Sequence, residues 1–430
     1  MLAVMMAGHE ASLAQLGVRT PRILLPRSGT DLTRWAVIAC DQHTSEPDYW
    51  NEVERIVANH PSTLRLIYPE VYLDDSDPAR RIAAIHETMR TYLDNGILED
   101  VGESMILTRR STPYAHDRRG LMLALDLEQY DYRPGATSLI RATEQTIAER
   151  LPPRVRIREG APLELPHVLV LINDPQDELF GKLSGRSLPA LYLADLMLGG
   201  GHVGGFRLDA QAVEHVARTL ERLLDRSDPA SRFLFAVGDG NHSLATAKEV
   251  WEKLKPEVEP DHPARYALVE VVNLYDPGLR FEPIHRLVRS ADPSGAIRAF
   301  TAAVGGTPEE LPPAEIPTQL AAQRGAGTAV GYVSRESCGI ITISGDSALP
   351  VAIVQSYLDS RHDLEVDYIH GWDACKKLGA REGALAIVLP EFDARLLYPT
   401  VTSRGVLPRK AFSLGEASEK RYYLEARRIL

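Results

Sequence analysis

Cysteine and long apolar runs are both scarce in this chain of 430 residues. The three cysteines, Cys40, Cys338 and Cys375, lie far apart and form no CxxC pair. This spacing excludes a dense disulfide framework and a sequence-evident zinc knuckle. No apolar run approaches the ~18–20 residues that cross a bilayer, and the run at 384–389 has the length of a buried strand. We therefore expect a soluble, cytoplasmic protein that does not contact a membrane.

Positive charge is also in deficit, because 48 Lys+Arg face 59 Asp+Glu and the formal net charge is −11. A general nucleic-acid binder usually needs a basic face that replaces the counterions of phosphates. We therefore expect a small-molecule substrate as the partner and no nucleic acid, and we leave a homodimer open. The remaining composition, 44% hydrophobic and 25% charged, is that of an ordinary globular protein.

Repeats of 20–50 residues and low-complexity tracts are absent from the sequence, which argues against solenoids and propellers. Short apolar runs instead alternate with helical patterns, and this alternation predicts a mixed α/β (α+β) fold. One helix is expected to begin near Ser45, and another directly after the glycine-containing turn at 238–240. The predicted strands are 35–40, 168–172, 233–237, 267–274 and a hairpin of 330–333 with 340–343.

Two segments with Pro and Gly, Arg133–Gly135 and Thr307–Pro317, are the best candidates for domain boundaries. They divide the chain into an N-terminal α/β region (1–132), a core (133–306) and a C-terminal α/β region (307–430). Either segment could instead be a surface loop within one domain.

The densest group of small and polar residues, 237–243, lies between a strand pattern and a helix pattern. Gly238 and Gly240 allow a tight turn, and the free N–H groups of the following helical turn favour a bound phosphate or carboxylate. Asn241 and Ser243 are further candidates for binding the phosphates of a nucleotide. The alternative is a plain strand-to-helix turn in which Asn241 or Ser243 caps the helix.

The same turn contains two candidate catalytic residues, Asp239 and His242. Asp239 could hold Mg²⁺ through oxygen contacts or orient a substrate hydroxyl. The His242 side chain could donate a hydrogen bond to a phosphate. The density of Asp, Asn, His and Ser favours a functional turn over a purely structural one.

A second polar group, 40–45, follows a predicted strand and precedes a predicted helix. Loops at the carboxyl ends of strands in α/β sheets are common ligand sites. Asp41 is the candidate general base. His43, Thr44 and Ser45 could bind phosphate oxygens. A plain helix cap would explain Ser45 and leave Asp41 and His43 without a role.

Arginines are concentrated between 141 and 158. Arg141 and Arg150 could bind a phosphate or carboxylate through paired hydrogen bonds, which the planar guanidinium makes better than an ammonium group. The alternative is charge pairing with nearby acidic residues on a solvated helix. His285 and Arg286 are two more potential donors to an anion.

One apparent motif is expected to be coincidental. Gly199, Gly201 and Gly204 spell the dinucleotide-binding pattern G-x-G-x-x-G, but the preceding residues 191–198 resemble a helix rather than the first strand of a βαβ unit. No Walker lysine loop, protein-kinase catalytic loop, G-x-S-x-G elbow or H-E-x-x-H helix is present in the sequence.

The turn at 237–247 and the segment 281–288 resemble the bacterial and archaeal family called domain of unknown function 1015. Its other blocks are similar to 35–50, 141–158, 367–371 and 407–423. The turn is also similar to the phosphate-binding turn of the ParB/sulfiredoxin-like superfamily, which includes nucleotide-dependent free-serine kinases and CTP-hydrolysing partition proteins. This resemblance implies a ParB/sulfiredoxin-like core with additional α/β segments.

The resemblance also implies an acidic residue that acts as a base on a substrate hydroxyl. Asp239 and His242 match the motif residue for residue, whereas Asp41 is assigned only from its position in a strand-end loop. The kinase-like motif runs Asp-Gly-His-His-Arg, and this chain has Asn241 and Ser243 at its third and fifth positions. The arginine is therefore missing, and a basic side chain from elsewhere would have to replace it: Lys248, Arg141 or Arg286.

We therefore predict a nucleotide- and Mg²⁺-dependent phosphotransferase, with ADP or ATP as the donor and a small hydroxyl-bearing metabolite such as serine as the acceptor. Asp41 would take the hydroxyl proton, Asp239 would position Mg²⁺, and the Gly240–Ser243 amides with His242 would stabilise the transferring phosphoryl group. Two alternatives stay open. The missing arginine favours a nucleotide-binding regulatory module without turnover, and a small-molecule hydrolase would need a nucleophile–base pair that the sequence does not show.

Overall fold

The computed structural model describes residues 10–322, 328–343 and 349–430, and it divides them into two units. Unit 1 comprises the residues up to Leu279 together with Thr402–Gly405 and Glu416–Leu430, and unit 2 comprises Arg280–Val401 and Val406–Gly415. The chain therefore leaves unit 1 after Leu279 and returns to it. The boundaries predicted from the sequence, at 132/133 and 306/307, fall inside unit 1 and inside unit 2 respectively. Both units combine helices and strands, which confirms the mixed α/β class.

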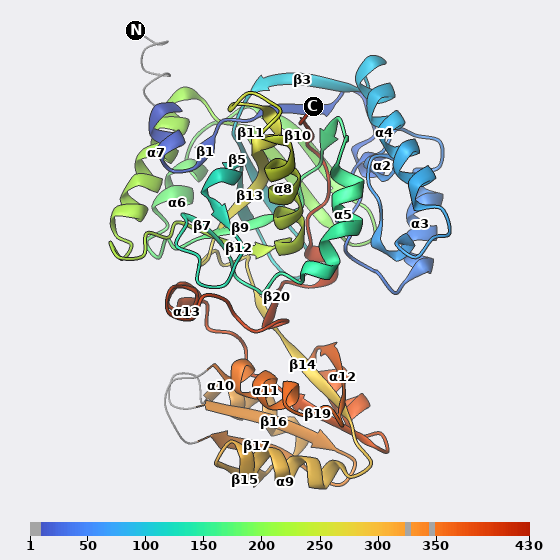
Figure 1. Ribbon diagram of the computed structural model, residues 1–430, viewed down its shortest axis with the longest axis vertical. Coiled ribbons are helices and arrows are strands. Elements are labelled where there is room, and N and C mark those ends of the chain that lie inside the picture. The colour runs from blue at the N-terminus through green and yellow to red at the C-terminus, as the bar shows by residue number, and fades with distance from the viewer. Residues whose placement is uncertain (1–9, 323–327, 344–348) are drawn as a thin grey trace. The chain divides into compact units, whose positions relative to one another are not determined.

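A large mixed sheet organises unit 1 (Figure 1). Parallel pairing occurs at β13–β9, β12–β7 and β6–β7, and the other described neighbours in this sheet are antiparallel. In order across the sheet the strands are β10 (Ala190–Leu196), β11 (Gly201–Arg207), β4 (Ile106–Ser111), β5 (Arg118–Asp126), β13 (Tyr266–Asn273), β9 (Leu169–Ile172), β12 (Phe235–Asp239), β7 (Ile140–Ala142) and β6 (Tyr130–Asp131), with β1 (Val18–Arg19) beside β5.

Each face of this sheet carries its own hydrophobic core, because side chains alternate along the strands. On β13, Val269 and Val271 contribute to the first core, whereas Leu268 belongs to the second. The first core is completed by α6 (Glu178–Ser184), α7 (Ala210–Asp225) and α8 (Asn241–Leu254). The second is completed by α2 (Leu32–Trp35), α3 (Pro47–Val57), α4 (Pro78–Asp94) and residues of the C-terminal segment Glu416–Leu430. Helix α5 (Leu151–Arg158) packs beside α8 (Figure 1).

The C-terminal segment, dark red in Figure 1, is part of unit 1 and is deeply buried there. Tyr422, Tyr423 and Leu424 belong to the second core. The Trp35 indole N–H donates to the carbonyl of Leu424 over 3.1 Å, and an isolated bridge joins Ile38 to Tyr422. Two short ladders lie nearby: β21 (Arg427–Arg428) pairs with β8 (Leu163–Glu164), and β2 (Arg22–Pro26) pairs with β3 (Leu98–Glu103). The segment thus packs as an integral element of unit 1.

Unit 2 is built on a smaller sheet that includes the predicted hairpin. Its strands, in order, are β15 (Gly306–Glu310), β17 (Cys338–Ile343), β16 (Thr328–Ser334), β19 (Ala384–Val388), β14 (Phe281–Arg289) and β18 (Glu365–His370), with β20 (Phe412–Leu414) beside β14. Its helices include α9 (Pro293–Ala303), α10 (Ile316–Ala322), α11 (Pro350–Asp359) and α12 (Trp372–Gly379), and α13 (Leu397–Arg404) follows where the chain passes between the units. The hairpin prediction is confirmed by the antiparallel β16–β17 pair.

Most predicted strands are present, with boundaries shifted by one or two residues. The runs 168–172, 233–237 and 267–274 correspond to β9, β12 and β13. The helix expected near Ser45 begins at Pro47, since Glu46 rather than Ser45 occupies the position before the first helical turn. Proline fits there because its missing N–H would have no partner in a first turn anyway.

Two predicted elements are wrong. Residues 35–40 are not a strand: Asp31 accepts hydrogen bonds from the N–H groups of Thr33 and Arg34 and caps the short helix α2, which ends at Trp35. Residues 191–198 are not a helix, because they contribute the edge strand β10 and its turn. The three glycines of the apparent dinucleotide motif therefore belong to the β10–β11 hairpin.

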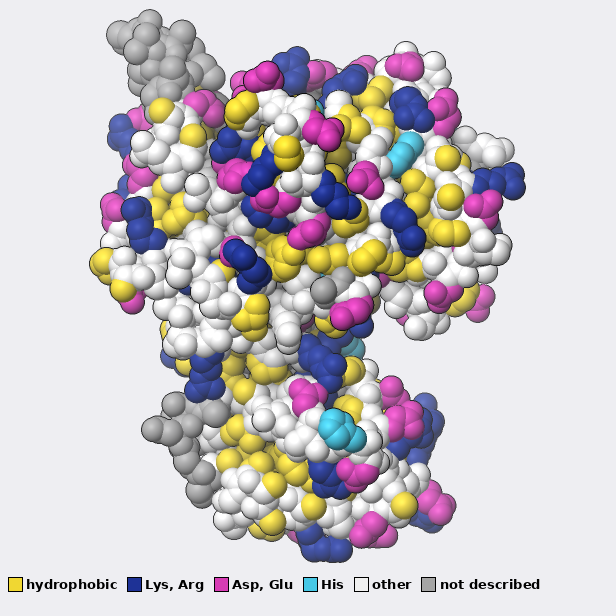
Figure 2. Space-filling model, viewed as in Figure 1, with side chains coloured by type: hydrophobic (Ala, Val, Ile, Leu, Met, Phe, Trp, Pro, Cys, Tyr) yellow, Lys and Arg dark blue, Asp and Glu magenta, His cyan; other side chains and the backbone are white. Residues whose placement is uncertain are grey.

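Charged side chains of both signs are interspersed on the face of the molecule shown in Figure 2. None of the helices in the described parts of the chain is long and apolar enough to cross a membrane.

Gly120 provides space for a carboxylate at the centre of the sheet. A Cβ atom at this position would lie 2.2 Å from Oε1 of Glu270 and 2.5 Å from Oγ1 of Thr108. Those two oxygens share a buried hydrogen bond of 2.6 Å, so neither can move without losing its partner. Because residue 120 on β5 is a glycine, there is room for the buried Glu270 side chain on β13.

Gly120→Ala should destabilise unit 1 by about 2–3 kcal/mol, because the added methyl group overpacks this site. The measurement is urea unfolding followed by tryptophan fluorescence. Gly185→Ala is the matched control: Gly185 has a negative φ, its nearest contact to a new Cβ is at 3.9 Å, and its change should stay below about 1 kcal/mol. Equal unfolding midpoints for the two variants would contradict the packing argument.

Candidate functional site

The predicted turn joins β12 to α8 in unit 1. Asp239 ends the strand, Gly240 takes φ +78°, and α8 begins at Asn241. A Cβ on residue 240 would lie 3.1 Å from the Cα of Val168, so both the left-handed backbone and the close approach favour glycine. The N-cap residue of α8 is Gly240, which has no side chain to cap the helix, so the cap position is occupied by neither Asn241 nor Ser243.

Asn241 and His242 position the segment that follows β7. The Oδ1 atom of Asn241 accepts the N–H of Thr143 over 3.2 Å, and its amide donates to the carbonyl of Val237 over 3.4 Å. The Nε2 atom of His242 accepts the N–H of Ile147 over 3.2 Å. Since Nε2 accepts a hydrogen bond, the neutral ring carries its proton on Nδ1. These two side chains thus hold a loop beside the turn.

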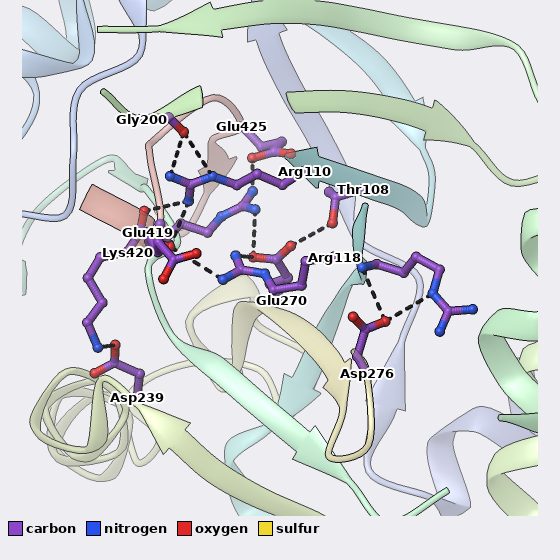
Figure 3. Close-up of polar contacts among 12 residues, drawn as sticks. Thr108, Arg110, Arg118, Gly200, Asp239, Glu270, Asp276, Glu419, Lys420 and Glu425 are labelled. Atoms are coloured by element: carbon purple, nitrogen blue, oxygen red, sulfur yellow. Dashed lines mark hydrogen bonds and ion pairs between the residues drawn. The ribbon is translucent and has the colours of Figure 1, made fainter. Parts of the chain in front are cut away.

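Asp239 forms an ion pair with Lys420 of the C-terminal segment (Figure 3). The Lys420 Nζ lies 2.9 Å from Oδ2, and the N–H of Gly240 donates to Oδ1 over 3.0 Å. Burial alone would raise the pKa of the Asp239 carboxyl, but Lys420, His167 and the Gly240 N–H outweigh it and hold the pKa below its usual value. Asp239 keeps 31% of its side-chain surface exposed and Lys420 keeps 10%, so the pair is accessible at one edge.

His167 and Tyr423 lie next to this pair. Register places Leu169 opposite Asp239, and His167 precedes that strand. The Tyr423 hydroxyl accepts the N–H of Cys40 over 3.1 Å and shares a hydrogen bond of 2.8 Å with Nδ1 of His167. Burial raises the pKa of Tyr423 well above its usual value, so the phenol stays protonated. Two hydrogen bonds therefore connect His167 to the loop that begins at Cys40, and His167 in turn acts electrostatically on Asp239.

Two carboxylates, Asp41 and Glu70, lie near Cys40. The N–H of Glu70 donates to the carbonyl of Cys40 over 2.8 Å, and the Glu70 carboxylate pairs with Arg154 at 2.5 Å. Burial, together with the negative charge of Asp41, raises the pKa of Glu70 against the opposing effect of Arg154. Asp41 also acts electrostatically on Tyr423. The Oδ1 atom of Asp41 itself accepts a hydrogen bond from the Gln42 amide over 3.0 Å.

Other predicted phosphate ligands have different surroundings. Arg141 is buried, and its guanidinium donates to the Ser138 and Arg232 carbonyls and to the Ser231 hydroxyl; residues 231 and 232 precede β12, whereas Asp239 ends it. Thr44 is exposed on the loop before α3.

His285 and Arg286 are buried in unit 2. The Nδ1 atom of His285 accepts the N–H of Leu389, and burial, helped by His370 and Arg286, lowers the pKa of His285 to about 4. Arg286 donates to the Gln355 amide oxygen. Neither is among the residues of the cluster around Asp239 in unit 1. Lys248, the remaining candidate substitute for the missing arginine, donates to the Leu127 carbonyl and pairs with Glu252.

Five of the residues described around Asp239 and Cys40 were not predicted from the sequence as site residues: Glu70, Arg154, His167, Lys420 and Tyr423. Lys420 and Tyr423 belong to the C-terminal segment, so only folding brings them to this part of unit 1. His167 could have been predicted from its position just before a predicted strand.

A buried ion-pair network supports the C-terminal segment from the centre of the sheet (Figure 3). Arg421 donates to Glu270 over 2.9 Å and also pairs with Glu425. Glu270 is 2% exposed, and Arg118 lies 3.9 Å from Oε2, the same carboxylate oxygen that Arg421 contacts. Burial would raise the pKa of Glu270, but Arg421, Arg118 and Thr108 lower it to about 2. Glu270 on β13 and Asp239 on β12 both pair in register with Leu169 on β9, which lies between these strands. The three residues therefore form one row across the sheet.

The described residues contain no group of three or more His, Cys, Asp or Glu side chains that could hold a metal ion. Asp239 offers a single carboxylate, whose oxygens already accept from Lys420 and Gly240. Mg²⁺ is usually bound by one or two carboxylates together with substrate phosphates. These residues therefore do not fit a resident Mg²⁺ site.

The fold and the site together define an α/β protein in which the Asp239–Lys420 pair lies beside the N-terminus of α8. The chain belongs to the family described as protein of unknown function (DUF1015), whose model matches residues 24–340. Lys420 and Tyr423 lie outside the matched residues. No curated protein matches the sequence.

Solved structures give only distant matches. A conserved hypothetical protein from Pyrococcus furiosus has 12% identity and a TM-score of 0.35, covering 70% of this chain and 90% of its own. A free serine kinase in complex with AMP has the same identity and coverages with a TM-score of 0.39. SbnI with a C-terminal truncation, from Staphylococcus aureus, has 9% identity and a TM-score of 0.37, covering 68% and 82%. These scores are too low to indicate a shared fold, and the ParB/sulfiredoxin-like core stays a prediction.

The stability of unit 1 should fall in acid because of Glu270. Its pKa is about 2 in the folded protein against an ordinary value of 4.5, so the stabilisation is fully present above about pH 4.5 and is lost as the pH falls towards 2. The contribution is roughly 3 kcal/mol. Urea unfolding between pH 7 and pH 2.5 measures it.

Glu270→Gln should flatten the pH dependence of unfolding below pH 4.5. Glu178→Gln is the control, because Glu178 pairs with Arg222 and Arg226 at the surface and its loss should leave the steep acid dependence in place. The same acid dependence in wild type and Glu270→Gln would show that Glu270 is not the group responsible.

Proposed function

We propose that this protein is a nucleotide-dependent phosphotransferase that acts on the hydroxyl group of a small metabolite. The observation that carries the proposal is the Asp239–Lys420 pair at the uncapped N-terminus of α8. A helix N-terminus attracts anions through its N–H groups and its dipole. An adjacent ammonium group adds the full positive charge that a triphosphate or diphosphate requires.

Lys420 supplies the cation that the sequence motif lacks. The kinase-like motif has an arginine where this chain has Ser243. None of the three basic residues considered from the sequence supplies this charge. Lys248 donates to the Leu127 carbonyl and Arg141 to the Arg232 carbonyl, and Arg286 belongs to unit 2. Lys420 reaches the turn from the C-terminal segment. A lysine would act on phosphate as a point charge, whereas an arginine would also fix its orientation.

The proposed step is a direct transfer. The acceptor hydroxyl oxygen bonds to the terminal phosphorus of ADP or ATP, and the bond from that phosphorus to the bridging oxygen breaks. The hydroxyl proton passes to the carboxylate of Asp41, and AMP or ADP leaves with the electron pair of the broken bond. The Gly240–Ser243 amides, His242 and Lys420 would stabilise the charge on the transferring group.

Glu70 would assist Asp41 in this step. Its carboxylate is fixed by Arg154, and burial, together with the negative charge of Asp41, raises the pKa of Glu70. A carboxylate with a raised pKa accepts a proton from a weakly acidic hydroxyl more readily than an ordinary carboxylate does. Mg²⁺ bound to the nucleotide phosphates would neutralise part of their charge.

Nucleotide binding should stabilise the protein against heat. At about 100 times its Kd a ligand adds ~2.7 kcal/mol, which corresponds to a shift of about 3 °C for a chain of this length. ADP, ATP, CTP and GTP, each with and without Mg²⁺, are compared. Lys420→Met should raise the nucleotide Kd about tenfold or more, whereas Lys182→Met, an exposed lysine on α6, should leave it unchanged. No shift with any nucleotide would overturn the proposal.

Removing the base should affect turnover rather than binding. Asp41→Asn should lower kcat about 10²–10⁴-fold with little change in the nucleotide Kd. Asp48→Asn, an exposed carboxylate in the first turn of α3, is the control with full activity. The assay follows phosphoryl transfer to serine and related hydroxyl compounds. Nucleotide binding by the wild type without any transfer would instead favour the regulatory module.

A further inference from the structure

The backbone of the residues around Lys420 is held by one buried arginine (Figure 3). The Nη1 atom of Arg110 donates to the carbonyls of Glu419 over 2.9 Å and Lys420 over 2.6 Å. Its Nη2 atom donates to the carbonyls of Ser418 over 2.8 Å and Gly200 over 2.9 Å. One side chain on β4 therefore fixes three successive carbonyls of the C-terminal segment and joins them to the β10–β11 hairpin.

Arg110 is 4% exposed, and its guanidinium donates to the backbone carbonyls of Gly200, Ser418, Glu419 and Lys420. Burial, together with the nearby Arg118, lowers its pKa to about 9, so the group remains charged at neutral pH. A charged donor to several carbonyls makes stronger hydrogen bonds than a neutral one. The arrangement accordingly fixes the place from which the Lys420 side chain extends to Asp239.

We propose that Arg110 is a positioning residue of the candidate site, which acts by holding the 418–420 backbone so that the Lys420 ammonium group stays at Asp239. This inference rests on the proposed function for its biological meaning. The geometric part concerns only the unliganded protein and can be tested without any nucleotide.

The chemical reactivity of single lysines provides that test. Trace labelling with acetic anhydride, read by peptide mass spectrometry across a pH series, gives the relative rate and apparent pKa of each amine. Lys420 and Lys248 should both react slowly in the wild type, since each is mostly buried and bound to a carboxylate. Arg110→Met should raise the rate at Lys420 about tenfold and leave Lys248 within about twofold.

Lys248 is the control against a general loss of structure, because it is similarly buried but lies on α8. Arg109→Met is the matched control variant: Arg109 neighbours Arg110 on β4 but makes two hydrogen bonds of 2.6 Å to Asp117 at the surface. It should change neither lysine. Arg110→Lys keeps the charge with fewer donors and should give an intermediate rate at Lys420.

Two results would overturn the inference: an unchanged rate at Lys420 in Arg110→Met, or an equal rise at both lysines. If Arg110→Met does not fold, Arg110→Lys decides by the same criterion. The nucleotide titration is read separately. If the wild type binds no nucleotide, the proposed function is wrong, but the positioning role of Arg110 can still be correct. If the wild type binds a nucleotide and the Lys420 rate is unchanged in Arg110→Met, the positioning role is wrong and the proposed function is unaffected.

Discussion

The ion pair between Glu270 and Arg421 lies at the centre of unit 1 and determines where the C-terminal segment can pack. Removing two charges from water costs several kcal/mol each, and their attraction offsets this only when the geometry and the remaining hydrogen bonds are good. Thr108, Arg118 and Glu425 complete those bonds. Any other placement of the segment would leave a buried carboxylate without its partner. Besides its contribution to stability above pH 4.5, the pair is therefore a determinant of position.

The buried pair also sets the position of the candidate site, because Arg421 is joined by one peptide bond to Lys420. Lys420 and Arg421 are neighbours in the chain, and their side chains pair with two carboxylates that stand in one row of the sheet. The row spans two strand spacings, or roughly 10 Å. The buried pair and the accessible pair thus share one backbone: the first fixes the segment, and the second stays available to a ligand.

The sequence predicted the parts of this arrangement that are contiguous in the chain. The turn at 238–243 was found because its glycines, polar residues and flanking patterns follow one another, and the strands β9, β12 and β13 were found from their apolar runs. Lys420 was not found, since it lies 181 positions after Asp239 and only tertiary packing brings them together. Arg141 was assigned to an anion because sequence does not show that nearby carbonyls occupy its donors. Residues 35–40 were predicted as a strand because they form a short apolar run. In the structure the end of helix α2 and contacts with the C-terminal segment provide the hydrogen bonds of their backbone instead.

Unit 2 is inserted between the two parts of unit 1 that meet at the site, and this order has a consequence for synthesis. A ribosome adds about 5–20 residues per second, so roughly 10–35 s separate Asp239 from Lys420. During this interval β13 already carries Glu270, while the arginine that pairs with it has yet to be made. A growing chain would therefore hold an incomplete anion site, with a helix N-terminus but no lysine, until the whole of unit 2 has been translated.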